Sequence, residues 1–148
     1  MLITTIGNMF GTDRTYDYWN ISQDELGYIY MDPKGPHENT IIMLHGYQEN
    51  STMFYNNFTE SLMAPASTRI ILPQAPLRWN SIWGGSYSRS WWELLKAITT
   101  IDELKDYSPF FDQKGIMDFC DSANTLIEAE IQMFPDKDSK RIFIGGMS

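Results

Sequence analysis

The sequence ends in a pattern that can place a nucleophilic serine. Arg141 to Ile144 is a short apolar run typical of a buried strand, and Gly145-Gly146-Met147-Ser148 follows it directly. Gly-x-Ser after a strand is the first half of Gly-x-Ser-x-Gly, the sharp strand-to-helix turn that exposes a serine Oγ above a sheet. A serine held in this way can attack a carbonyl carbon. The alternative role of Ser148 is the N-cap of the next helix, and the local context leaves both open.

A second Gly-x-Ser occurs at Gly84-Gly85-Ser86. No apolar strand precedes it, and Ser88 stands where the full motif needs glycine. We therefore take Ser148, and not Ser86, as the candidate nucleophile.

The second chemical signal lies about a hundred residues upstream, in Leu44-His45-Gly46-Tyr47. An apolar strand that ends in His-Gly and leads into a helix can present a backbone N–H to a reacting carbonyl oxygen. Such an oxyanion-hole donor contributes about 3–4 kcal/mol to catalysis. Gly46 allows close approach to a substrate, and we expect the amide of Tyr47 to be the donor. We expect His45 to hold this loop by hydrogen bonds and not to act as a base.

The elements that must position these groups follow an α/β pattern. Apolar runs predict strands over 26–31, 40–44, 69–72 and 141–144, and apolar spacing predicts helices over 51–63 and 115–134. Alternation of strand and helix is typical of a mostly parallel sheet with helices on both faces. We expect an irregular segment over 74–90. Either Asn50 or Ser51 can cap the first helix, and Cys120 falls on the apolar stripe of the second.

Length and composition set limits on partners and location. A chain of 148 residues forms at most one domain, here 1–148, and its 43% apolar content is typical of a folded protein. The net charge of −8 argues against nucleic acid and against anionic membrane surfaces as partners. A single cysteine and an N-terminus without signal-peptide features favour the cytoplasm.

These motifs together resemble the carboxylesterase/phospholipase family of α/β-hydrolases that includes the acyl-protein thioesterases. The resemblance runs from Thr40 to Ser148 and departs from the family at Gln74, at Glu93 and after Tyr47. It rests on four blocks in the family's order: Leu44-His45-Gly46, Leu72-Pro73-Gln74-Ala75-Pro76, Ser90-Trp91-Trp92-Glu93 and Arg141 to Ser148.

The resemblance implies an α/β-hydrolase fold, truncated after the nucleophile strand, and a Ser-His-Asp mechanism with Ser148 as nucleophile. The Asp and His would follow Ser148, so the domain would be incomplete and these residues alone inactive. Carboxylic esters or acyl thioesters, on small molecules or proteins, would be the substrates, with neither cofactor nor metal. Gly46, Trp83, Trp91 and Trp92 would shape the substrate site, although core packing explains each tryptophan equally well.

Two other functions are weighed against this one. A truncated or degenerate hydrolase could serve as a non-catalytic binding module. An enzyme similar to dienelactone hydrolases would need a cysteine nucleophile, and the mid-helix position of Cys120 argues against it. Without a basic amphipathic helix we expect no stable membrane association, and the sequence leaves the oligomeric state open. The apolar strand at 141–144 would form an unpaired edge, from which we expect aggregation or dimerisation of the isolated polypeptide.

Overall fold

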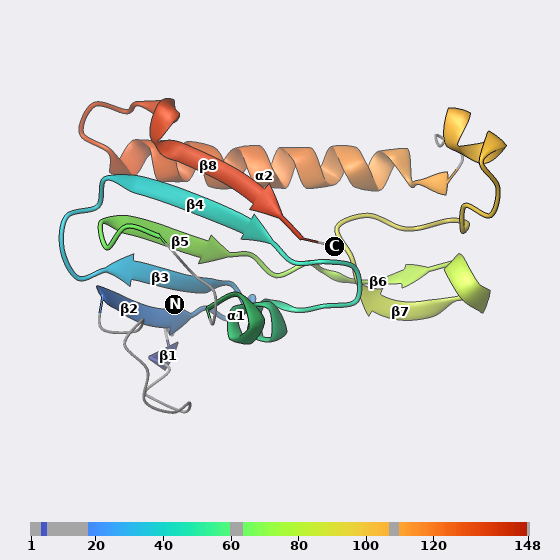
Figure 1. Cartoon of the computed structure of the whole chain (residues 1–148), viewed down its shortest axis with the longest axis horizontal. Helices are drawn as coiled ribbons and strands as arrows, with labels where there is room; N and C mark the ends of the chain where they lie inside the picture. The colour runs from blue at the N-terminus through green and yellow to red at the C-terminus, as the bar shows by residue number, and fades with distance from the viewer. Residues whose placement is uncertain (1–3, 6–17, 60–63, 107–109, 148) are drawn as a thin grey trace.

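The computed structural model describes residues 4–5, 18–59, 64–106 and 110–147, and it is built around a six-stranded sheet (Figure 1). The strands lie in the order β1-β2-β3-β5-β4-β8. β4 runs parallel to β5 and β8, whereas β3 runs antiparallel to β5 and β2, so four of the six strands share one direction. The α/β prediction is confirmed. The strands are β1 (Thr4–Thr5), β2 (Trp19–Gln23), β3 (Ile29–Pro33), β4 (Asn39–Leu44), β5 (Thr68–Leu72) and β8 (Ile142–Gly146).

Two helices cover opposite faces of this sheet. α1 (Ser51–Thr59) follows β4 and leads to β5, and α2 (Gln113–Met133) leads to β8 on the other side of β4. Because the two crossovers step in opposite directions and right-handed crossovers are strongly preferred, the helices are placed on different faces. Figure 1 shows α2 behind β8 and β4, with α1 on the near side. The prediction of helices on both faces is confirmed.

The core between α1 and the sheet is apolar. Phe54 and Tyr55 of α1 pack with Ile70 and Leu72 of β5, and all four side chains are buried. Their neighbours Ile29 and Met31 on β3 are fully buried as well. This cluster holds β3, β5 and α1 together.

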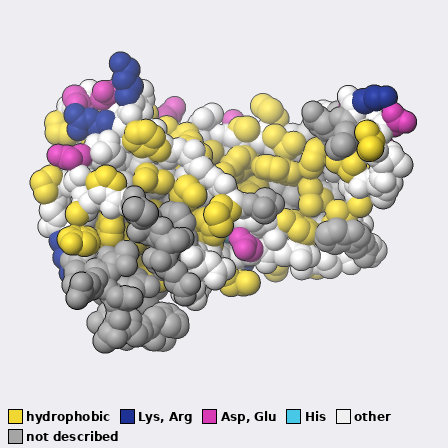
Figure 2. Space-filling model, in the orientation of Figure 1, with side chains coloured by type: hydrophobic (Ala, Val, Ile, Leu, Met, Phe, Trp, Pro, Cys, Tyr) yellow, Lys and Arg dark blue, Asp and Glu magenta, His cyan; other side chains and the backbone are white. Residues whose placement is uncertain are grey.

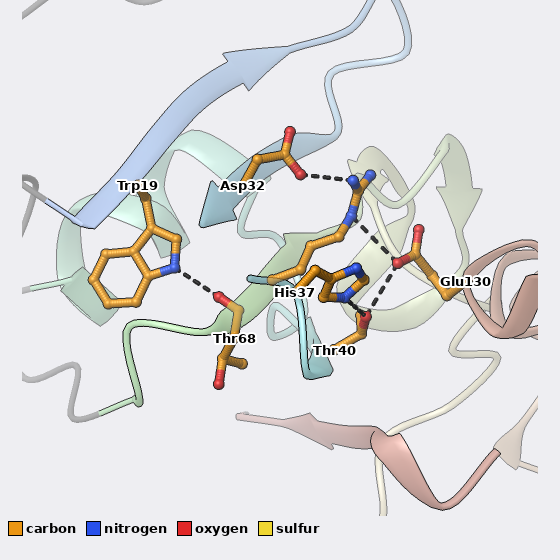
Figure 3. A network of polar contacts seen from close by, with 7 residues as sticks. Trp19, Asp32, His37, Thr40, Thr68 and Glu130 are labelled. Atoms are coloured by element: carbon orange, nitrogen blue, oxygen red, sulfur yellow. Dashed lines mark hydrogen bonds and ion pairs between the residues drawn. The ribbon is translucent and has the colours of Figure 1, made fainter. Parts of the chain in front are cut away.

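The α2 face of the sheet carries a buried polar network (Figure 3). The Oγ1 of Thr40 donates to Glu130 of α2 at 3.1 Å, and the guanidinium of Arg69 pairs with the same carboxylate at 3.2 Å. Arg69 also bonds Asp32 at 2.6 Å, and Nε2 of His37 lies 2.8 Å from Thr40 Oγ1. Since Thr40 and Arg69 sit near the start of their strands, this network lies at the amino edge of the sheet.

The predicted boundaries shift where local turns intervene. β3 begins at Ile29 and not at 26, because a turn closed by Asp24 holds Leu26 and Gly27 outside the strand. α1 is described only to Thr59, and residues 60–63 of the predicted helix lie outside the described part. The N-cap of α1 is Asn50, whose Oδ1 accepts the Met53 amide at 2.8 Å.

The prediction of an irregular segment over 74–90 is wrong. β6 (Leu77–Asn80) and β7 (Ser86–Arg89) form an antiparallel hairpin around a short 3₁₀ turn at Ile82–Gly84. Leu77, Trp79 and Tyr87 on the two strands face solvent, so the usual link between apolar side chains and burial does not apply to these strands. Asn80 is fully buried and bonds the hydroxyls of Ser88 and Ser90.

Two further 3₁₀ turns, at Asp102–Lys105 and Ser139–Arg141, precede α2 and β8. Cys120 is exposed. The expectation that it lies on the apolar stripe of α2 is therefore wrong. Among the described residues, no helix is long and apolar enough to cross a membrane.

Candidate active site

The candidate site lies where three parallel strands end at one edge of the sheet. β4 ends at Leu44, β5 at Leu72 and β8 at Gly146. The chain leaves β4 toward α1 on one face and leaves β5 toward the hairpin and α2 on the other. Adjacent parallel strands whose connections depart to opposite faces create a crevice at their carboxyl ends, where α/β proteins bind ligands.

His45 holds the loop after β4 in place. The amide of Ala75 donates to its Nε2 at 3.1 Å, so Nε2 is an acceptor and the proton resides on Nδ1. Nδ1 in turn donates to the carbonyl of Gly46 at 2.8 Å. Burial lowers the pKa of His45 below 6.5, which keeps the ring neutral. Both nitrogens are engaged, which agrees with the expected structural role and not with a catalytic base.

The backbone of this loop is fixed on both sides of Tyr47. The amide of Gly46 donates to the Glu49 carboxylate at 2.8 Å, and the amide of Gln48 donates to the Arg89 carbonyl at 3.0 Å. Gln48 adopts a left-handed conformation with φ of 65° to make this turn. These bonds exclude the Gly46 and Gln48 amides as oxyanion donors in this arrangement.

The loop after β5 is tied to the same region. Oε1 of Gln74 accepts the amide of Ser51 at 2.6 Å, at the first turn of α1. Gln74 is one of the positions at which the sequence departs from the family that it resembles, and here its side chain holds the start of α1.

A pocket of about 360 Å³ opens between the loop after β4 and the segment that follows the hairpin. It brings together Gly46, Tyr47, Trp91 and Trp92, which the sequence had selected separately. Both indole rings also contact Phe119 of α2, with ring centroids 5.4 and 5.7 Å apart. Figure 2 shows hydrophobic side chains gathered near the carboxyl end of β8 and the first half of α2. The pocket is lined by Leu44, His45, Gly46, Tyr47, Ser90, Trp91, Trp92, Leu94, Phe111, Gly146 and Met147.

The strand that leads to the candidate nucleophile reaches this pocket. Gly146 pairs with Leu44, and the amide of Met147 donates to the Leu44 carbonyl at 3.1 Å. Met147 lines the pocket. Ser148 itself lies outside the described residues, as does the side chain of Trp83. The pocket is therefore bounded by the residue that immediately precedes Ser148.

The sequence did not predict how the pocket wall that contains Leu94 and Phe111 is formed. Leu94 and Phe111 form an isolated antiparallel bridge, so the wall joins residues on either side of a long excursion. Buried Asn80 supports it by accepting the Leu94 amide at 3.0 Å. An asparagine in a turn-rich segment carries no local signal for this role.

The fold and the crevice at the carboxyl ends of its strands define an α/β-hydrolase framework. The phospholipase/carboxylesterase family model matches residues 29–148, most of the sequence. The chain therefore belongs to the phospholipase/carboxylesterase family, which confirms the resemblance found in the sequence.

A solved structure supports the same assignment. The chain is similar to acyl-protein thioesterase 2 from Zea mays, with 25% identity and a TM-score of 0.56 over 82% of this chain. The match covers 46% of that thioesterase, so the chain spans about half its length. No curated protein sequence matches the chain significantly.

Proposed function

We propose that this chain supplies the nucleophile and part of the oxyanion hole of a serine hydrolase that cleaves carboxylic esters or acyl thioesters. Ser148 is the nucleophile, and the amide of Tyr47 donates to the developing oxyanion. The observation that carries the proposal is the shared pocket, because Met147, Tyr47 and two tryptophans line it although they come from three parts of the sequence.

We infer that neither histidine of the chain is the general base. His45 has both ring nitrogens engaged. His37 lies at the amino edge of the sheet, with its ring centroid 4.6 Å from that of Phe134. These are the two histidines of the chain. A serine without its base loses on the order of a millionfold in turnover, so the 148 residues alone should be inactive.

The walls of the pocket favour an apolar acyl group. Trp91, Trp92, Leu94 and Phe111 present mostly hydrocarbon surface. Because Gly46 has no side chain, it leaves room for the substrate to approach the oxyanion loop. We propose Trp83 as a further residue of the substrate site. The acyl group is carried by a small molecule or a protein. The single cysteine favours a reducing compartment, and we propose the cytoplasm.

Fluorophosphonate labelling tests the proposal. The full-length protein that contains this sequence should be labelled and should hydrolyse a p-nitrophenyl ester or an acyl thioester. Ser148→Ala should abolish both, whereas Ser86→Ala, which changes an exposed serine at the start of β7, should leave both intact. Absence of labelling in the folded full-length protein would contradict the proposal and favour a non-catalytic binding module.

A further inference from the structure

The segment Arg89–Trp91 fastens the loop after β4 to the loop after β5. The carbonyl of Arg89 accepts the Gln48 amide at 3.0 Å, and its guanidinium donates to the carbonyl of Ala75 at 2.9 Å. The amide of Ser90 donates to the Pro76 carbonyl at 3.3 Å. Arg89 therefore links the two loops that border the candidate site, and Ser90 adds a second bond to the loop after β5.

Trp91 bonds the start of the candidate oxyanion loop. Its indole N–H donates to the carbonyl of His45 at 2.8 Å, and its ring lies 4.9 Å from the imidazole centroid. Because a peptide unit is planar, fixing the His45 carbonyl also fixes the direction of the Gly46 N–H. That N–H points to Glu49, as its 2.8 Å hydrogen bond shows.

His45 fixes the next peptide in the same way. Its Nδ1 donates to the carbonyl of Gly46, which also accepts the Glu49 amide at 3.2 Å. The carbonyl of Gly46 and the N–H of Tyr47 belong to one planar peptide, so holding the first sets the direction of the second. Trp91 thus orients one peptide directly and the following peptide through the imidazole on which it packs.

We propose that Trp91 is a positioning residue that, together with His45, sets the direction of the Tyr47 N–H. This inference rests on the proposed function, in which that N–H is the oxyanion donor. The indole N–H of Trp91 then acts on turnover and not on substrate affinity, because oxyanion bonds strengthen in the transition state. Trp91 thus lines the pocket and also holds the loop after β4 through its bond to the His45 carbonyl.

The test replaces Trp91 by Phe in the full-length protein, which removes the N–H and keeps an aromatic ring. The matched control is Trp19→Phe, because the Trp19 indole makes the same type of bond, to the Thr68 carbonyl at 2.7 Å, in the core. We expect Trp91→Phe to lower kcat about tenfold to a hundredfold with KM within about twofold, and Trp19→Phe to lower the melting temperature with kcat unchanged. Equal kcat in Trp91→Phe and wild type would overturn the inference.

A second readout needs no activity. Amide hydrogen exchange at Gly46 and Gln48 should accelerate at least tenfold in Trp91→Phe and remain unchanged in Trp19→Phe. Unchanged exchange would overturn the inference even in a protein that hydrolyses nothing, so its failure is separable from that of the proposed function. If Trp91→Phe does not fold, benzothienylalanine at position 91 removes the same N–H within an almost identical ring shape, with the same expected results.

Discussion

The amide of Met147 donates a hydrogen bond to the carbonyl of Leu44, with 3.1 Å between nitrogen and oxygen. Met147 directly precedes Ser148, and Leu44 directly precedes His45. One hydrogen bond therefore joins the strand that leads to the candidate nucleophile to the loop that carries the candidate oxyanion donor. The end of β8 and the start of the loop after β4 are thus joined by sheet pairing, which is rigid compared with a loop contact.

This pairing predicts an unequal response of two adjacent glycines. A β-carbon on Gly146 would lie 3.2 Å from the Leu44 backbone oxygen, the same atom that accepts the Met147 amide. We expect Gly146→Ala to lower the free energy of unfolding by about 1–2 kcal/mol and to reduce kcat at least tenfold, because backbone must move. Urea unfolding and esterase assays of the full-length protein check this.

Gly145→Ala is the control. Its β-carbon would lie 2.7 Å from Sδ of Met43, nominally a closer contact, but the flexible thioether can move aside. We therefore expect Gly145→Ala to change the free energy of unfolding and kcat less than Gly146→Ala does. A larger loss in Gly145→Ala than in Gly146→Ala would contradict the proposed role of the Leu44 contact.

His45 predicts a loss of stability in mild acid. Burial lowers its folded pKa below the unfolded value of 6.5, so the unfolded chain binds the proton more readily. The stability it contributes is complete above pH 6.5 and declines as the pH falls toward the folded pKa. His45→Gln should therefore destabilise most at pH 7.5, and its effect should shrink toward pH 5.

Urea titrations at several pH values measure this difference between wild type and His45→Gln. Burial also lowers the pKa of His37, so the single variant retains part of the acid dependence and a double variant with His37→Gln should retain less. A difference that grows as the pH falls would contradict the neutral, doubly bonded imidazole.

Glu130 predicts the opposite pH dependence. Burial raises its folded pKa above 4.5, against the opposing effects of Arg69 and the Thr40 hydroxyl. Between pH 4.5 and the folded pKa, the folded state binds more protons, so stability from this site falls as the pH rises through that window. Glu130→Gln lacks this titration, and its destabilising effect should be greatest at the acid end of the window.

Thermal or urea unfolding of Glu130→Gln at pH 4.5 and 7 gives the comparison. Asp32→Asn is a suitable control, because it removes the other carboxylate that pairs with Arg69 at a more exposed position. A constant difference between Glu130→Gln and wild type across the window would show that Glu130 does not titrate there.

β8 lies at one end of the described sheet, with Phe143 and Ile144 each about half exposed, at 53% and 54%. Exposed apolar strands at a sheet edge promote association. We expect the isolated 148-residue polypeptide to dimerise or aggregate, and Phe143→Lys to reduce this by placing a charge beside the edge. Sedimentation velocity measures both. A monomeric wild-type polypeptide would contradict this expectation.

The sequence was informative wherever burial and local pattern coincide. The continuous apolar runs that became β4 and β5 were predicted to within a few residues, since strands buried on both faces contain few polar side chains. The run that became β8 was predicted from the same pattern, although Phe143 and Ile144 are about half exposed. The hairpin of β6 and β7 was missed, because Leu77, Trp79 and Tyr87 face solvent while Asn80 is buried. In this hairpin, apolar side chains are exposed and a polar side chain is buried, which is the reverse of the usual pattern.

The candidate nucleophile strand, the His-Gly loop and the aromatic block could each be recognised in the sequence, because each motif is a run of covalent neighbours. How these motifs meet depends on contacts between distant segments. Ala75 reaches His45 across 30 residues and Trp91 reaches it across 46, and no local pattern encodes which backbone group a side chain bonds at such separations. The tautomer of His45, the direction of the loop peptides and the position of Trp91 follow from sheet packing, which brings the ends of β4, β5 and β8 to one edge.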